Sequence, residues 1–177
     1  FKEWDYHEGL EFFLRDTYEL HGKLSRMVKE LNEFYLSTPA LYEIEDSWDG
    51  FEWLAPDDAD RNMVSFLRRD KAGNEVITLV CFSGVDVPDY RLGVPRRGKY
   101  KIVFNTDDVK YGGEGKISKK TITAVKKPSH GKQYSIPVAI PKLTCLYLVR
   151  EPDAPKAEKP KATAKKPAAK KPSAGKA

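Results

Sequence analysis

Hydrophobic and polar residues follow two different periods along this chain, and the change falls close to residue 49. Before it, apolar residues recur every three or four positions, which is typical of one face of an α-helix. After it, short apolar or alternating runs are separated by Gly, Pro, Asn and Asp, which is typical of strands joined by turns. The pattern predicts a helical segment followed by a domain made of strands.

A single long amphipathic helix is predicted over Thr17 to Leu36. Asp16 stands three residues before Glu19, which is the spacing of an N-cap side chain with a reciprocating carboxylate. Pro39 follows the last apolar position and ends the helix. The apolar positions form one stripe, namely Leu20, Leu24, Met27, Val28, Leu31 and Tyr35. A stripe of that length needs a large surface to lie on.

The clearest β signal is a hairpin between Met63 and Phe82. A first strand is predicted over Met63 to Arg69, and the turn formers Asp70 to Asn74 follow it. The second strand, Val76 to Phe82, has almost no polar alternation. A strand that is apolar on both sides is usually covered on both faces. We therefore place Val76 to Phe82 in the interior of a sandwich rather than at an edge.

Further strands follow at the spacing typical of a sandwich. They are predicted over Tyr90 to Val94, Tyr100 to Phe104, Thr121 to Val125, Tyr134 to Ile140 and Leu143 to Val149. Seven or eight strands with no helix between them predict a mainly β fold, an antiparallel β-sandwich. Cys81 and Cys145 fall inside apolar runs of this kind, which favours buried free thiols over a disulfide or a metal site.

Three segments are expected: residues 1–48, which hold the helix, residues 49–150, which form the sandwich, and a tail at residues 151–177. The net charge of +5 lies entirely in the tail, which holds eight lysines against three acids. The tail is rich in Lys, Ala and Pro and is predicted to be disordered. The chain begins at Phe1 rather than Met, so we expect a piece of a longer protein. No apolar run approaches the roughly 20 residues that span a bilayer.

The lysine-rich tail has a composition that can neutralise the phosphates of nucleic acid. A solvated linker accounts for the same composition at least as well. The tail has no aromatic residue for base stacking, and the rest of the chain offers no matching basic patch. Nucleic-acid binding through the tail is therefore not favoured.

The titratable residues form no recognisable catalytic set. Asp5 and Glu8 could pair as acid and base, although ionisable groups in a loop are more often simply solvated. The segment Asp57 to Asp60 lacks the ligand spacing of an EF-hand, which favours a solvated acidic loop. The segment Tyr111 to Gly115 could cradle a phosphate, but it lacks the GK[ST] ending of a P-loop, which favours a flexible hairpin loop. No catalytic residue and no metal ligand is assigned.

Aromatic residues are the best candidates for binding a ligand, because an aromatic face packs against the apolar C–H face of a sugar ring. Trp4, Tyr6 and Trp48 are the residues we would test for sugar stacking. For Trp4 and Tyr6, in a polar loop, stacking and an ordinary loop role stay equally open. Phe51 and Trp53 share one face of a predicted strand, which favours packing in the core.

Several motifs occur in the order seen in one family: FKEWDYHEGLEFFL, LNEFYLSTPALYEI, DGFEW, SFLRR, LVCF, YRLGVP, FNTD and YGG. Over about Phe1 to Val149 the chain resembles bacterial 1,4-α-glucan branching enzymes, members of the α-amylase superfamily. The resemblance implies that Phe1 to Asp16 is the loop after the last strand of a (β/α)₈ barrel. It implies that Thr17 to Leu36 is the last barrel helix and that Asp49 to Val149 is the C-terminal β-domain.

The activity implied by the resemblance is that of a cytoplasmic enzyme of glycogen synthesis. Such an enzyme cleaves an α-1,4 link through a covalent glucosyl-enzyme and transfers the chain to a 6-hydroxyl, with no metal or organic cofactor. Its catalytic carboxylates lie upstream of Phe1, so this chain alone is expected to be inactive. The expected partners are α-glucan and the missing catalytic barrel, and no membrane. Without the barrel wall, the stripe from Leu20 to Leu31 is expected to be only partly covered.

Two other functions compete with this one. A non-catalytic carbohydrate-binding module would explain an aromatic surface on a β-sandwich, and it would show as glucan affinity lost on changing Trp4 or Trp48. A nucleic-acid-binding protein acting through the tail would show as binding that depends steeply on salt.

Overall fold

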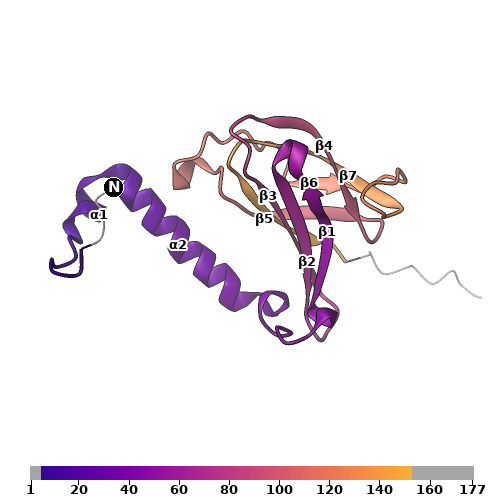
Figure 1. The fold of residues 1–177 in the computed structure, drawn as a ribbon, viewed down its shortest axis with the longest axis horizontal. Coiled ribbons are helices and arrows are strands. Elements are labelled where there is room, and N and C mark those ends of the chain that lie inside the picture. The colour runs from indigo at the N-terminus through magenta and orange to yellow at the C-terminus, as the bar shows by residue number, and fades with distance from the viewer. Residues whose placement is uncertain (1–4, 153–177) are drawn as a thin grey trace, which may run out of the picture.

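A computed structural model describes residues 5–152, in which a helical arm leads into eight β-strands (Figure 1). The arm consists of helices α1 (Phe13–Thr17) and α2 (Glu19–Ser37), followed by the short 3₁₀ turns η1 (Pro39–Leu41) and η2 (Trp48–Gly50). The strands are β1 (Phe51–Asp58), β2 (Met63–Arg69), β3 (Glu75–Cys81), β4 (Val87–Val94), β5 (Lys99–Asn105), β6 (Thr121–Thr123), β7 (Tyr134–Ile140) and β8 (Cys145–Arg150). The predicted mainly β, antiparallel fold is confirmed. The predicted disorder of the tail concerns residues that lie outside the described range.

The helical arm differs from the single helix predicted over Thr17 to Leu36. The backbone is extended at Tyr18, which separates α1 from α2. Asp16 is not an N-cap, because it lies inside α1 and its Oδ1 accepts a hydrogen bond from Arg15 Nε at 2.9 Å. The predicted end of the helix is correct to within one residue, since α2 stops at Ser37 before Pro39. Of the helices between residues 5 and 152, none combines the length and apolarity needed to cross a bilayer.

The predicted hairpin is confirmed as β2 and β3, which pair antiparallel from Met63↔Cys81 to Arg69↔Glu75. Its turn is held by Asp70, whose carboxylate accepts from the Asn74 backbone N–H and from Asn74 Nδ2, each at 2.7 Å. Strand β3 lies between β2 and β8 and is buried on both faces. Placing this run in the interior of the sandwich was therefore correct.

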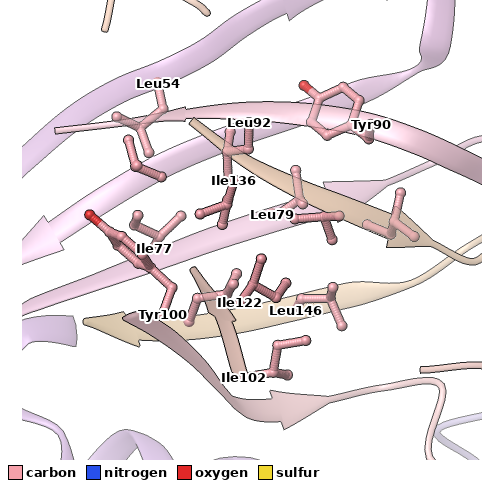
Figure 2. Packing of buried hydrophobic residues seen from close by; sticks show 14 of the residues in the cluster. Leu54, Ile77, Leu79, Tyr90, Leu92, Tyr100, Ile102, Ile122, Ile136 and Leu146 are labelled. Carbon is pink, nitrogen blue, oxygen red and sulfur yellow. The ribbon is translucent and has the colours of Figure 1, made fainter. Parts of the chain in front are cut away.

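The strands form two sheets that enclose one core. Six strands lie in the order β1-β2-β3-β8-β5-β6, and β4 pairs with β7 in the second sheet. Side chains from the facing sides of both sheets interdigitate, as Figure 2 shows for Ile77 and Leu146 against Leu92 and Ile136. The Tyr100 ring is buried in this core, and its hydroxyl donates to the Arg96 carbonyl at 2.8 Å. The sandwich therefore completes its core within this chain.

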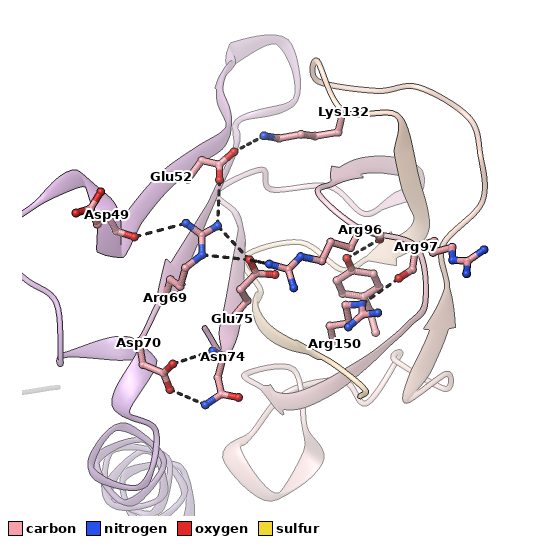
Figure 3. A network of polar contacts seen from close by, with 11 residues as sticks. Asp49, Glu52, Arg69, Asp70, Asn74, Glu75, Arg96, Arg97, Lys132 and Arg150 are labelled. Atoms are coloured by element: carbon pink, nitrogen blue, oxygen red, sulfur yellow. Dashed lines mark hydrogen bonds and ion pairs between the residues drawn. The ribbon is translucent and has the colours of Figure 1, made fainter. Parts of the chain in front are cut away.

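A charged network ties the two sheets together along one side (Figure 3). The buried Glu75 carboxylate on β3 accepts from Arg69 Nη2 at 3.0 Å and from Arg96 Nη2 at 3.4 Å. Glu52 on β1 pairs with Arg69 and with Lys132 from the segment before β7. The hydrogen bond from Lys132 is the main cause that lowers the pKa of Glu52 below its usual value. The network links β1, β2 and β3 to turns that carry the second sheet.

Candidate functional site

Four aromatic rings gather on the outer face of the six-stranded sheet, at its β1 edge. The centroid of Phe51 lies 4.8 Å from that of Trp53, 5.4 Å from that of Phe66 and 5.9 Å from that of Trp48. Trp53 also meets Phe66 edge-on, with centroids 6.0 Å apart. The strand register explains the cluster, since Trp53 on β1 is opposite Phe66 on β2. We call these four residues the aromatic cluster.

The predicted core position of Trp53 was wrong, because 47% of this residue is exposed. Phe51 and Trp53 do share a face of β1, as predicted, but that face points away from the space between the sheets. The neighbouring Leu54 and Ala55 are buried instead. Strand β1 is an edge strand, so its outer face has no neighbour on one side.

A groove of about 440 Å³ lies beside the aromatic cluster. It is lined by Ile44, Glu45, Asp46, Ser47, Trp48, Phe51, Trp53 and Arg68. Arg68 Nη2 donates to the Ile44 carbonyl at 3.0 Å and holds this wall against β2. Gly50 allows the same close approach, because a Cβ at that position would lie 2.2 Å from the Ile44 carbonyl oxygen. The groove thus has an aromatic floor and a fixed, polar wall.

The structure brings Trp48 together with the aromatic cluster but does not bring it near Tyr6. Trp48 is 78% exposed at the mouth of the groove. Tyr6 belongs to the segment before α1, and α1 lies at the end of α2 that is remote from β1 (Figure 1). Tyr6 is 72% exposed, and its ring lies 3.8 Å from the His7 ring, centroid to centroid. Trp4 lies outside the described residues.

A second groove, of about 950 Å³, lies where helix α2 contacts the sandwich. It is lined by residues of α2, of β5 and of the 3₁₀ turn η4 (Val109–Tyr111). The Glu30 carboxylate accepts from Arg26 Nε at 2.7 Å and from both Lys110 Nζ and the Tyr111 hydroxyl at 2.6 Å. These bonds, led by that from Lys110, lower the pKa of Glu30 to about 2. These hydrogen bonds attach α2 to the sandwich, and we call this contact the joint.

Phe34 is the aromatic part of this joint, and sequence reasoning missed it. Its ring lies 5.8 Å from that of Phe104 and 5.3 Å from that of Tyr147, centroid to centroid. Phe34 follows Leu31 by three positions and Met27 by seven, and all three are half-buried. The spacing of Met27, Leu31 and Phe34 could have identified these residues as the face of α2 that meets the sandwich. The prediction that the stripe from Leu20 to Leu31 is only partly covered is confirmed, since Leu20, Leu24 and Val28 are exposed.

The glycine-rich loop is not a phosphate cradle. The buried Asp107 carboxylate already accepts hydrogen bonds from the backbone N–H of Glu114, within the loop, at 2.8 Å and of Lys116, directly after it, at 2.7 Å. Gly113 allows this fold, since a Cβ there would lie 2.3 Å from the Asp107 backbone. The loop joins the antiparallel strands β5 and β6, as expected of a hairpin loop, and it is anchored around one carboxylate.

The other candidate residues also have structural roles. Asp5 Oδ1 accepts from the His7 backbone N–H at 2.9 Å, which closes a local turn. The predicted acidic loop begins later than expected, because Asp57 and Asp58 belong to β1.

Both cysteines are free; Cys81 is buried and Cys145 is half-buried, and burial raises the pKa of the Cys145 thiol to about 11. Between residues 5 and 152, no three His, Cys, Asp or Glu residues are grouped so that they could hold a metal ion.

Comparison with known proteins agrees with this fold and with the resemblance found in the sequence. The 1,4-alpha-glucan branching enzyme GlgB of Aquifex aeolicus is 41% identical over 152 residues, which make up 85% of this chain and 24% of that enzyme. The 1,4-alpha-glucan branching enzyme GlgB of Halothermothrix orenii is 38% identical over 148 residues, which make up 83% of this chain and 23% of that enzyme. The chain thus spans about a quarter of the length of these curated relatives. Residues 53–151 match the alpha amylase C-terminal all-beta domain, and the chain belongs to that family.

Proposed function

We propose that this chain is the C-terminal part of a cytoplasmic 1,4-α-glucan branching enzyme. The longer protein cleaves an α-1,4 link and transfers the released chain to form an α-1,6 branch in glycogen. The observation that carries the proposal is the similarity to two GlgB enzymes over more than four fifths of this chain. The carboxylates that attack and protonate the glycosidic bond belong to the upstream part, and this chain alone is inactive.

In this proposal residues 1–48 are the last loop and helix of the catalytic barrel, and residues 49–150 are the C-terminal domain. Support comes from the apolar side chains that α2 and the segment before α1 leave exposed. Leu10, Phe12, Leu24 and Val28 line a groove of about 520 Å³ on the arm. An apolar surface of this kind marks a contact with another part of a protein. The upstream part of the same polypeptide covers it.

The test extends the chain with the residues encoded upstream of Phe1 and measures branching of amylose by loss of iodine staining. The extended protein should branch amylose, and the 177-residue chain should not. In the extended protein, Val28→Glu should lower the melting temperature and the activity together, because an unpaired charge is then buried in a contact. Val85→Glu changes a more exposed valine on the sandwich side and is the matched control. No branching by the extended protein would refute the proposal.

A second function is a non-catalytic carbohydrate-binding module. It is favoured by one observation, the aromatic cluster with Trp48 standing exposed beside a groove. In that case, the extended protein would bind glucan without converting it. The branching assay therefore separates the two functions.

A further inference from the structure

We propose that the second groove, which lies between α2 and the β5 side of the sandwich, binds a nucleotide. The groove encloses about 950 Å³, which lies within the roughly 300–1,000 Å³ typical of small-molecule sites. Its lining has a cationic part and an apolar part, and each suits one half of such a ligand. The inference goes beyond the proposed function and does not depend on branching activity.

Three lysines from separate elements line the groove, namely Lys29 on α2, Lys101 on β5 and Lys120 directly before β6. Lys120 is held beside β5, because its carbonyl accepts a hydrogen bond from the Ile102 backbone N–H at 2.8 Å. Lys101 precedes Ile102, so Lys101 and Lys120 are neighbours across the two strands. Within residues 5–152, neither Lys101 Nζ nor Lys120 Nζ has a hydrogen-bond or ion-pair partner. Lys29 Nζ lies 4.0 Å from Glu33 Oε1, at the limit of an ion pair.

The unpaired lysines point to a bound anion. Elsewhere in the groove a lysine has its own carboxylate, since Lys110 Nζ lies 2.6 Å from Glu30 Oε2. Like charges on neighbouring strands repel each other, and an anion between Lys101 and Lys120 would relieve that repulsion. Lysines on an edge strand often prevent aggregation. That role would account for Lys120, beside the edge strand β6, but not for Lys101, because β5 lies between β8 and β6.

The carboxylates of the groove leave this positive charge uncompensated. Five cationic and three acidic side chains line the groove. Glu30 already accepts three hydrogen bonds within the joint, and Asp108 Oδ1 accepts from the Lys110 backbone N–H at 3.1 Å. The third acid, Glu33, is exposed on α2. Lysine binds phosphate as a point charge, so the β5 side of the groove suits the phosphates of a nucleotide.

The apolar part of the groove suits the base. It is formed by the half-buried Phe34 ring and by Val103, Val109 and Ile117. Val103 is 39% exposed and Val109 is 58% exposed, so this surface is open to a ligand. A nucleotide base has flat faces that pack against aromatic and apolar side chains. Inorganic phosphate would fill only a small part of the groove and would leave this surface in water, which favours a nucleotide.

A ligand in this groove touches α2 and the sandwich at once, and it should therefore strengthen the joint. A molecule that binds only the docked arrangement stabilises that arrangement by mass action. Hydrogen exchange in α2 should become slower when ATP is added, while exchange in β3 should stay the same. The response separates a bridging ligand from one that only touches the surface of the sandwich.

The test measures binding of ATP to the 177-residue chain by isothermal titration calorimetry, without magnesium. Inorganic triphosphate and adenosine are measured as the two halves of the ligand, and ATP should bind on the order of tenfold more tightly than either. Lys101→Glu should weaken ATP binding by on the order of tenfold, because it replaces an attraction by a repulsion. Lys101→Arg keeps the charge and should keep the binding. Val103→Ser should weaken binding of ATP and leave that of triphosphate unchanged.

Lys71→Glu is the matched control for the charge reversal. Lys71 is exposed, and its Nζ also lacks a partner in the part of the chain that the structure describes, but it lies outside the groove. The lysine-rich tail is present in both variants. Lys71→Glu should therefore leave ATP binding unchanged.

Several results would overturn the inference. Equal losses from Lys101→Glu and Lys71→Glu would show that ATP responds only to the net charge of the chain. Triphosphate that binds as tightly as ATP would show a surface for polyanions rather than a nucleotide site. If ATP does not bind, the inference fails, and a lower melting temperature of the extended protein with Lys101→Glu would then identify the groove as a contact with the upstream part. None of these results decides whether the extended protein branches amylose.

Discussion

The sandwich and the helical arm bury their apolar residues to very different extents. Seventeen buried hydrophobic residues from both sheets form one cluster in the sandwich, whereas neither α1 nor α2 contains a buried residue. Both regions have clear apolar patterns in the sequence. The difference is that every strand packs against other strands of this chain, whereas the helices have packing partners for only part of their apolar surface.

This contrast shows where the stability of the chain lies. The sandwich gains from removing apolar surface from water, which is the dominant favourable contribution to folding. Helix α2 is held to the sandwich mainly by one joint, in which Glu30 and Phe34 meet the η4 turn and the sheet. The arm should therefore open at a lower free energy than the sandwich. The predictions on Leu79, Phe34 and Glu30 test that ranking.

The largest effect is expected in the sandwich core. Leu79→Ala removes a side chain with 0% exposure and leaves a cavity, so it should lower the free energy of unfolding by about 2–5 kcal/mol. Leu20→Ala, at a residue 64% exposed on α2, should change it by less than about 0.5 kcal/mol. Urea denaturation followed by far-ultraviolet circular dichroism measures both. Similar losses from the two changes would contradict the comparison.

A smaller effect is expected at the loop anchored by Asp107. Asp107→Ala leaves the backbone N–H groups of Glu114 and Lys116 without their acceptor, which should cost about 1–3 kcal/mol. Thermal unfolding gives the stability, and backbone NMR shifts show which residues respond. The shifts should concentrate in the loop and spare α1. Asp89→Ala, at an exposed carboxylate on β4, is the control, and an equal loss there would rule out a special role for Asp107.

Much of the fold could be predicted because its signals are local. The hairpin from Met63 to Cys81 is encoded by two apolar runs and a cluster of turn formers. The division into six strands and two could not be predicted, because it depends on contacts such as Thr78↔Tyr147 between residues far apart in the sequence. Helix α1 was missed because the residues before Thr17 show no apolar period, so a loop was expected there.

The candidate site was only partly predictable for the same reason. Trp48 was chosen because an aromatic face can stack on a sugar ring, and the structure leaves it exposed at the mouth of a groove. Phe66 joins the cluster only through the register that sets it opposite Trp53, and no local pattern encodes that register. Whether a strand residue faces the core or the outside is decided by a shift of one position. Phe34 was missed because it lies outside the predicted stripe, on the side that meets the sheet.

The joint should respond to loss of its aromatic part. Phe34→Ala removes ring contacts with Phe104 and Tyr147, so the docking of α2 should weaken by about 0.5–1.5 kcal/mol. Hydrogen exchange should show faster exchange in α2 and no change in β3. In the unmodified monomer α2 should already exchange faster than β3. Equal protection of the two elements in that monomer would show that the arm is not the weaker region.

The smallest expected effect is a dependence on pH of the docking of α2, which tests the Glu30 carboxylate in the joint. The pKa of Glu30 is lowered to about 2 in the folded chain, chiefly by the hydrogen bond from Lys110 and also by those from Tyr111 and Arg26. A lowered folded pKa means that the charged carboxylate stabilises the docked helix above the ordinary pKa of a glutamate. This contribution is lost as the pH falls from that value towards about 2. The loss should be confined to the joint.

NMR measures this response through the amide chemical shifts of α2 and of the η4 turn. The pH is lowered from 6 to 2 in steps on the order of one pH unit. These shifts should move together in the lower half of that range, while amides of β3 keep their shifts. Glu30→Gln should remove the transition and leave α2 loosely docked at every pH, because the amide cannot replace the charge opposite Lys110. Glu33→Gln is the control on the same helix, where the nearest cation, Lys29, lies 4.0 Å away. If the shifts of α2 stay constant down to pH 2 in the unmodified chain, Phe34 and its neighbours hold the helix without help from the charge.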